Sequence, residues 1–269
     1  MAQNKPRNHR NGELANMRKS VGALIALITF LAFFVAMMPA AFVYNFFQDK
    51  ISRVIPDVKF NGFEGTVWSG KSYVQIRHFP VVLSTWKISP LALFKARIQS
   101  SLSFSSNGLT GSADISLSNK GVDINNLSAV ARSNYLNQFT IPYGLDLSGN
   151  IQLSNANLSF DNEWLTDSEG ELTWQGGIVH IQTPQQIHTA SLPPLKGQIY
   201  QQERILRLDV RGAELDLMSV QIKPDGWAIV AINYALLDLT DIPLLADATE
   251  RREKPDRENP AVVLEEKIL

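Results

Sequence analysis

The segment "LTGSADISLS", Leu109–Ser118, decides the fold because its apolar and polar residues alternate without interruption. Every second residue from Leu109 to Leu117 is apolar or glycine, and the residues between them are threonine, serine or aspartate. Successive side chains of a β-strand point to opposite faces of a sheet. The period of two therefore predicts a strand with one face in a core and the other in water.

Similar alternation recurs on both sides of this segment. It is found in Leu147 to Leu153, "GELTWQGGIVHI" (Gly170–Ile181), Leu206 to Val210 and Trp227 to Ala231. Five stretches, spaced at uneven intervals, also share a glycine that is followed by alternating polar and apolar residues: "FEGTV", "LTGSA", "LSGNI", "SEGEL" and "LKGQI". Glycine relieves crowding where a sheet twists or coils sharply. We therefore predict a mainly β fold, with a curved antiparallel β-sheet of the β-groove or half-barrel kind.

One short helix is predicted in "WKISPLALFKAR", Trp86–Arg97, where Ser89 is a suitable N-cap and Pro90 fits the first helical position. We expect it to close one end of the sheet. Residues 132–143 show no clear period, and "TASLPPLKG", Thr189–Gly197, marks a break. Either region could be a hinge between two halves, although a single continuous body is the preferred interpretation.

The stretch "GTVWSGKS", Gly65–Ser72, matches the pattern of a phosphate-binding loop. Such a loop needs a helix after it, whereas the residues that follow, Tyr73 to Arg77, are strand formers without helical spacing. We therefore predict no nucleotide site here. The preferred interpretation is a β-hairpin with a strand from Val58 to Trp68, a tight turn at Ser69-Gly70 and a return strand from Lys71.

The N-terminal part of the chain resembles a membrane anchor. Residues 1–20 carry five basic residues against one glutamate, and no charged residue occurs from Val21 to Phe47. About twenty apolar residues in a helix cross the ~30 Å hydrocarbon layer. We predict a transmembrane helix at 21–47 with the basic N-terminus in the cytoplasm. A periplasmic β-rich domain at 48–245 and a charged, mobile tail at 246–269 would follow.

A cleaved signal peptide is the alternative to a retained anchor. Pro39-Ala40-Ala41 could serve as its small-residue cleavage site. The apolar stretch is, however, far longer than the ~7–15 residues usual in signal peptides, so a retained anchor is preferred.

Residues suited to catalysis or metal binding are sparse. The chain has no cysteine, and no serine lies in a Gly-x-Ser-x-Gly elbow. His180 and His188 have no acidic residue between them, and the carboxylate pairs Asp161/Glu163 and Glu169/Glu171 are interpreted as surface charge. The five tryptophans could line a ligand groove, but core packing is preferred. We expect no enzyme activity, no cofactor, no metal and no nucleic-acid partner.

Two stretches carry a resemblance to a known family. The run "FNGFEGTVWSG", the later "VVLSTWKISPLALFKARI" and the following "NGLTGSADISL" resemble type II secretion system protein N, also called general secretion pathway protein N. The likeness is strongest over residues 55–120. The residues that match its motifs are Gly65, Thr66, Trp68, Gly70, Trp86, Ser89, Pro90 and Leu91.

The resemblance implies a non-enzymatic, single-pass component of the bacterial inner membrane. Such a component would assemble or stabilise the apparatus that exports folded proteins across the outer membrane, with other secretion components as its partners. A free sheet edge could dock such a partner, because its unpaired N–H and C=O groups can accept another strand. The alternative, drawn from a likeness to periplasmic β-groove proteins, is a tethered domain that binds or transfers lipid.

Overall fold

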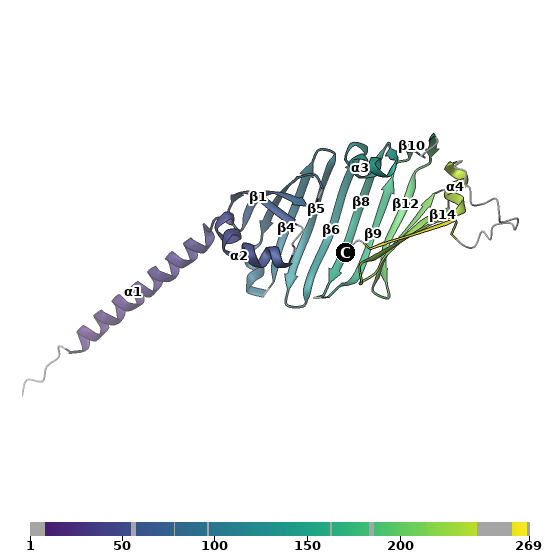
Figure 1. Ribbon diagram of the computed structural model, residues 1–269. Helices are drawn as coiled ribbons and strands as arrows, with labels where there is room; N and C mark the ends of the chain where they lie inside the picture. The colour runs from purple at the N-terminus through teal and green to yellow at the C-terminus, as the bar shows by residue number, and fades with distance from the viewer. Residues whose placement is uncertain are drawn as a thin grey trace, which may run out of the picture.

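The computed structural model describes residues 9–54, 58–77, 79–95, 97–161, 163–182, 186–212, 214–240 and 260–267. Two helices come first: α1 (His9–Ala36) extends away from the rest of the molecule, and α2 (Ala40–Val54) lies beside the first strands (Figure 1). Strands make up most of the remaining chain, as the alternating sequence predicts.

The main sheet has 13 antiparallel strands that are hydrogen-bonded in nearly the order of the chain. Its strands, in spatial order, are β1 (Val58–Gly65), β2 (Ser69–Ile76), β3 (Val82–Ile88), β4 (Ile98–Ser106), β5 (Leu109–Ser118), β6 (Gly121–Arg132), β8 (Asn150–Phe160), β9 (Leu165–Trp174), β12 (Leu195–Gln202), β13 (Ile205–Gly212), β14 (Leu215–Ile222), β15 (Trp227–Ile232) and β16 (Val262–Lys267). Neither residues 132–143 nor the two prolines after Leu192 divide it. The main sheet is therefore continuous across both regions at which a hinge was considered.

One face of this sheet carries a continuous row of paired residues, which we call the inner row. It runs across Ser72, Ser84, Phe104, Gly111, Ala129, Leu153, Leu172, Gly197, Val210, Met218, Ile232 and Val262. The row on the other face that starts at Lys71 continues through Thr85, Ser103, Ser112 and Ser128. The sheet therefore has an apolar face and a polar face.

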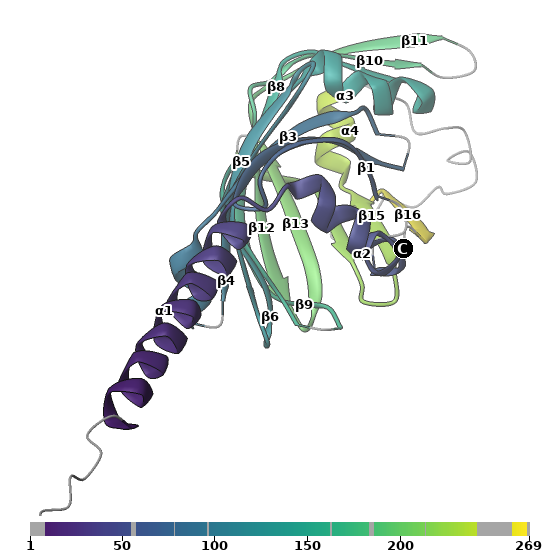
Figure 2. The same cartoon turned by 90° about the vertical axis from the view of Figure 1, so that its left-hand side faces the viewer.

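The sheet is curved, and both α2 and α4 (Tyr234–Thr240) lie on the side toward which it curves (Figure 2). Tyr44 of α2 packs on Phe63 of β1, and Phe63 packs on Trp86, which lies on the same face as the inner row. The concave face is thus the apolar one. Few side chains are fully buried: among the described residues only eleven apolar side chains are. Within the described inner row, Val210 is the only buried side chain that is larger than serine.

Glycines allow large side chains to lie flat on the concave face. A Cβ built on Gly111 would overlap the Phe104 ring, and one on Gly197 would lie 2.8 Å from Leu208. The recurring glycines in "LTGSA" and "LKGQI" therefore make space within strands. Those in "FEGTV" and "LSGNI", Gly65 and Gly149, instead have positive φ angles of 90° and 82°.

A second, three-stranded sheet lies at one end of the main strands. It contains β7 (Leu145–Leu147), β10 (Gly177–Gln182) and β11 (Ile187–Leu192), in the order β11-β10-β7. Helix α3 (Ser133–Thr140) is joined to it, because the Asn137 side-chain amide donates to Leu147 O and accepts from Leu147 N, both at 2.9 Å. A short 3₁₀ turn, η2 (Ile141–Tyr143), links α3 to β7.

Several predicted elements differ from the structure. The strand expected at Leu147–Leu153 is two strands in different sheets, since the positive φ of Gly149 ends β7 before β8 begins. Gly170–Ile181 is likewise divided between β9 and β10 by a turn at Gly176, which also has positive φ. The predicted short helix is a 3₁₀-helix, η1 (Pro90–Lys95), and helices α3 and α4 were not predicted.

The two ends of the chain also differ in part from expectation. The stretch predicted as one helix, Val21–Phe47, is divided between α1 and α2 at Met37–Pro39. Across the described residues, none of the helices combines the length and the apolar character needed to cross a membrane. The charged tail predicted at 246–269 includes strand β16, which pairs with β15, while 246–259 lie outside the described residues.

Candidate functional site

The candidate site is the junction at which the two helices meet the first hairpin of the sheet. It begins with Pro39, which has no N–H and cannot donate to the carbonyl of Val35, four residues earlier. That carbonyl instead accepts the indole Nε1–H of Trp68 at 2.9 Å, together with the N–H of Met38 at 3.3 Å. Trp68 thus satisfies a backbone acceptor that the proline leaves free at the end of α1.

The hairpin turn is attached to the helix break by its backbone as well. The N–H of Val67 donates to Met38 O at 3.0 Å, and Thr66 forms an isolated antiparallel bridge with Pro39. Within the turn, Thr66 N–H donates to Ser69 O at 2.9 Å. One turn of the sheet therefore holds both sides of the break between α1 and α2.

The predicted β-hairpin is confirmed as β1 and β2, but the predicted position of its turn is wrong. Gly65 pairs with Gly70, so the turn is Thr66–Ser69 and not Ser69-Gly70. The positive φ of Gly65 lets the chain turn there, and the contacts to Met38 and Val35 hold residues 67 and 68 outside the strand. No helix follows this loop, in agreement with the rejection of a phosphate-binding loop: the next element is β2.

A second tryptophan closes the junction from the neighbouring strand. Trp86 of β3 donates its Nε1–H to Val67 O at 3.0 Å, and Ile88 N–H donates to Trp68 O at 2.6 Å. The Trp86 ring lies directly over Gly70, where an added Cβ would come within 2.6 Å of it. Gly70 therefore has to be glycine for Trp86 to reach the turn.

Aromatic rings join α2 to the same place. Tyr44 lies 4.5 Å from Phe63 and 5.8 Å from Phe60, measured between ring centroids, and Phe63 lies 6.2 Å from Trp86. Offset and edge-to-face ring pairs of this kind stabilise packing beyond the area that they bury. Tyr44 of α2 thus packs against the first strand of the sheet.

On the polar face beside the junction, Lys71 Nζ lies 2.9 Å from Glu64 Oε2. The hydrogen bond to Glu64 and the charge of this carboxylate raise the pKa of Lys71. Both side chains are well exposed, so the ion pair stabilises the fold little. It borders an open depression of about 630 Å³ that is lined by Ser69, Thr85 and Ser103 among others.

The structure brings together five of the eight residues predicted from the family motifs: Gly65, Thr66, Trp68, Gly70 and Trp86. The other three continue beyond β3, where Ser89 N–H donates to Gln99 O at 2.9 Å and Ser89 O accepts from Ala92 N–H. Leu91 is 74% exposed on η1 and does not cover the sheet. Ala92, the next residue of η1, is buried.

The two histidines considered for chemistry lie on paired strands but are not cross-strand partners, and each has its own hydrogen bond. His180 shares a hydrogen bond with Thr189 at 2.9 Å and His188 with Gln186 at 2.9 Å, on two neighbouring strands. Within the described ranges, no group of three or more histidine or acidic side chains is arranged to hold a metal ion.

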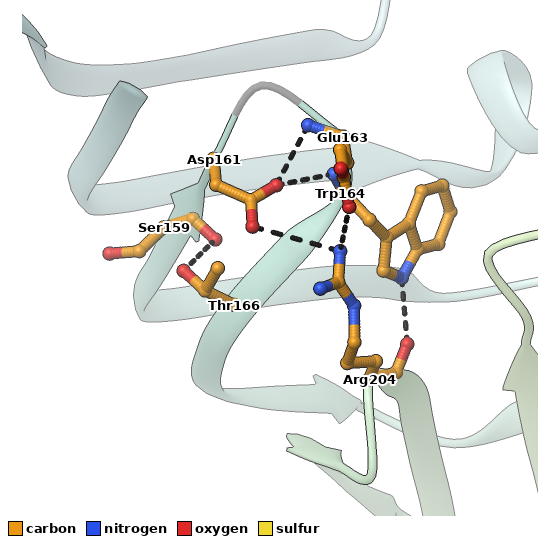
Figure 3. A network of polar contacts seen from close by, with 6 residues as sticks. All are labelled: Ser159, Asp161, Glu163, Trp164, Thr166 and Arg204. Carbon is orange, nitrogen blue, oxygen red and sulfur yellow. Dashed lines mark hydrogen bonds and ion pairs between the residues drawn. The ribbon is translucent and has the colours of Figure 1, made fainter. Parts of the chain in front are cut away.

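Asp161 and Glu163 take part in a network of polar contacts that joins the β8–β9 turn to the β12–β13 turn (Figure 3). Asp161 Oδ1 accepts the N–H groups of Trp164 at 2.7 Å and Glu163 at 2.8 Å, which lowers the pKa of this carboxyl group. Arg204 of the β12–β13 turn lies 3.6 Å from Asp161 and 3.4 Å from Glu163, and its carbonyl accepts Trp164 Nε1–H at 2.7 Å. This arrangement holds turns together.

Four tryptophans hold distant segments of the chain together by one hydrogen bond each. Trp68, Trp86, Trp164 and Trp174 each donate the indole N–H to a backbone carbonyl distant in sequence. Trp174 is buried, as the preferred packing interpretation requires, whereas Trp227 is 40% exposed. Sequence reasoning missed Val35, Met38 and Pro39 as parts of the site; the proline within an apolar helix was their one signal.

Comparison with known proteins gives a match to a family model. Residues 56–249, more than half of the chain, match the model of the family described as type II secretion system (T2SS), protein N. No curated protein and no solved structure matches. The matched region begins just before β1 and includes all eight motif residues.

Proposed function

The chain belongs to the type II secretion system protein N family, and we propose that it acts as a non-enzymatic, membrane-tethered component that assembles or stabilises the secretion apparatus. Its family makes it a component of type II secretion, with other components of that system as partners. The finer proposal concerns how it contributes. The helices would hold the sheet at the inner membrane, and the sheet would hold partners on the periplasmic side.

The junction is the observation that carries this proposal. Trp68, Val67 and Thr66 attach the first hairpin to the break between α1 and α2 through two hydrogen bonds and a bridge. A flexible linker would let the sheet turn freely, whereas these bonds set its direction relative to α1. Fixed orientation is of use to a scaffold, and a binding domain on a tether would not need it.

The tether itself is supported by the sequence. No charged residue occurs from Val21 to Phe47, and basic residues precede this stretch. Along α1 the described apolar side chains are exposed, for example Phe30 and Phe33 at 64% each. Alkaline phosphatase fused after Leu269 should be active in whole cells if residues 48–269 are periplasmic, and an inactive but intact fusion would contradict this topology.

A secretion assay tests the scaffold role directly. Exchanging Trp68 for phenylalanine keeps a ring but removes the N–H that Val35 accepts, so we expect export to fall while the protein level stays normal. Lys71→Ala is the matched control, because it removes only an exposed ion pair of the same hairpin. Equal export in both variants would contradict a scaffold that depends on the junction.

Site-specific crosslinking identifies the partners. Thr110 and Asp114 point from the polar face of β5, so photoreactive residues at these positions should form adducts with other secretion components. Labelling by phospholipid alone would favour the second candidate function.

That second candidate is binding of lipid acyl chains on the concave face. The observation in its favour is that the apolar residues of the inner row, such as Leu153, Leu172 and Met218, are only half-buried in the described structure. A photoreactive fatty acid should then label a probe residue at Leu208 more than one at Asp209, which lies on the polar face of the same strand. Equal labelling at both positions would remove this candidate.

A further inference from the structure

The outermost strand at the C-terminal end of the main sheet has an open edge. Strand β16 pairs with β15 from Val262 to Lys267 without any register shift, and it is last in the strand order. In the described part of the chain no strand pairs with its other side. Val263 is 50% exposed and Leu264 is 58% exposed. A regular strand in this position presents a row of unpaired N–H and C=O groups.

The opposite edge of the sheet is less suitable for pairing. Strand β1 has a register shift between Asn61 and Glu64, and Gly62 within it has a positive φ of 61°. Such bulges bend and twist an edge so that another strand cannot continue the ladder. Of the two edges, β16 is the one that an incoming strand can extend.

Charge on β16 defines the chemistry of that strand. Glu265 is paired with Ile229 and Glu266 with Ala228, so β15 offers neither carboxylate a cation. Leu264 is paired with Val230 and continues an apolar row of the concave face. A strand that places lysine or arginine opposite the two glutamates and apolar residues opposite Val262 to Leu264 would satisfy each position.

A second copy of this chain fits poorly. Two β16 strands in a fully aligned antiparallel register would put Glu265 opposite Leu264 and Glu266 opposite Val263, and each carboxylate would face an aliphatic group. A shift of one residue toward the C-terminal end puts Glu265 opposite Glu265, and a shift of two puts Glu265 opposite Glu266. A shift of one in the other direction again puts both carboxylates opposite aliphatic residues, Val263 and Val262. Like charges directly opposite destabilise a strand pair.

We propose that the free edge of β16 accepts an extended segment of another protein, in which two adjacent basic residues precede three apolar, β-branched ones. The segment runs antiparallel to β16 and extends the sheet by one strand. This inference rests on the proposed function, because it identifies the surface by which the scaffold holds a partner.

The experiment uses the full chain in phospholipid vesicles and two synthetic peptides. One peptide carries two lysines followed by three β-branched apolar residues, and in the other the lysines are replaced by glutamates. We expect the lysine peptide to bind and to protect β16 amides from hydrogen exchange. In the double variant Glu265→Lys/Glu266→Lys its affinity should fall by about tenfold, since cross-strand charge pairs contribute up to about 1 kcal/mol each.

A double variant elsewhere controls for net charge. Glu203→Lys/Glu214→Lys changes the charge equally at two exposed turns, and it should leave peptide binding unchanged. Equal affinity for the lysine and the glutamate peptide, or binding that protects no β16 amide from exchange, would overturn the inference. Neither outcome would affect the secretion result for Trp68→Phe. Normal secretion by the Glu265→Lys/Glu266→Lys variant would overturn β16 as the docking edge; loss of secretion in it but not in the control supports it.

Discussion

At its β1 end the main sheet is bulged, packed against α2 and attached to a helix break, whereas at its β16 end it is regular and exposed. Side-chain and backbone hydrogen bonds of defined geometry hold the first end, from Trp68 to Val35 and from Val67 to Met38. In the described residues, the ladder between β15 and β16 holds the second. The first end is thus fixed to the helices, and the second is the end at which we propose that a partner strand docks.

The largest effect should follow from removing the tryptophan at the β1 end. Trp68→Ala deletes a half-buried ring and the donor to Val35 O, and we expect the free energy of local opening of β1 and β2 to fall by about 2–3 kcal/mol. Trp227→Ala at the β16 end removes an exposed ring and should cost less than about 1 kcal/mol in the opening of β15. Native-state hydrogen exchange measures both quantities, and equal losses would contradict the comparison.

A smaller effect is expected where the junction is tightly packed. Gly70→Ala would place a Cβ 2.6 Å from the Trp86 ring and against Glu64 O, which should destabilise the protein by roughly 1–3 kcal/mol. Gly22→Ala on α1 is the control, because nothing lies within 4 Å of its added Cβ. The melting temperature from near-ultraviolet circular dichroism should fall only for Gly70→Ala.

The unmodified chain should already show the difference between the ends. Amides of β16 have one strand neighbour and exposed side chains, so we expect them to exchange about tenfold faster than those of β2, which lies between two strands. Slower exchange in β16 than in β2, in the absence of any partner, would show that its edge is already covered.

The smallest effect concerns a turn distant from both ends. The N–H groups of Trp164 and Glu163 hold the pKa of Asp161 below its ordinary value of 3.8. The stabilising contribution of this carboxylate is therefore present above the unfolded-state pKa and is lost as the pH falls through the lower folded-state pKa. The indole N–H resonance of Trp164 should shift over that acid range in the parent chain and stay flat in Asp161→Asn, while resonances of Trp68 stay constant in both.

Periodicity was sufficient to predict an antiparallel sheet, because alternation in segments such as Leu109–Ser118 reports directly which face is buried. Turns were predicted less well. The β1–β2 turn lies three residues earlier than expected since Val67 and Trp68 bind the helix break, a contact with a segment about thirty residues away that local patterns cannot reveal.

The candidate site was predicted in part: the family motif indicated its hairpin residues, but not the helix residues Val35, Met38 and Pro39. The family motif indicated Thr66 and Trp68, yet the bridge of Thr66 to Pro39 and the hydrogen bond of Trp68 to Val35 depend on the helix being divided. Strand β16 was missed for a different reason. Its sequence "VVLEEK" is charged at one end and lacks full alternation, and its pairing with β15 decides its structure.

The near-sequential order of the strands has a consequence for biogenesis. From β1 to β6 each strand pairs with the one made just before it, and the later strands follow with few interruptions. Because such contacts are close in sequence, a chain synthesised from its N-terminus can add strands one at a time as they emerge. The nascent sheet would then begin at the β1–β2 hairpin that Trp68 attaches to the helices. It would grow at one edge only, and β16 would be the last strand added.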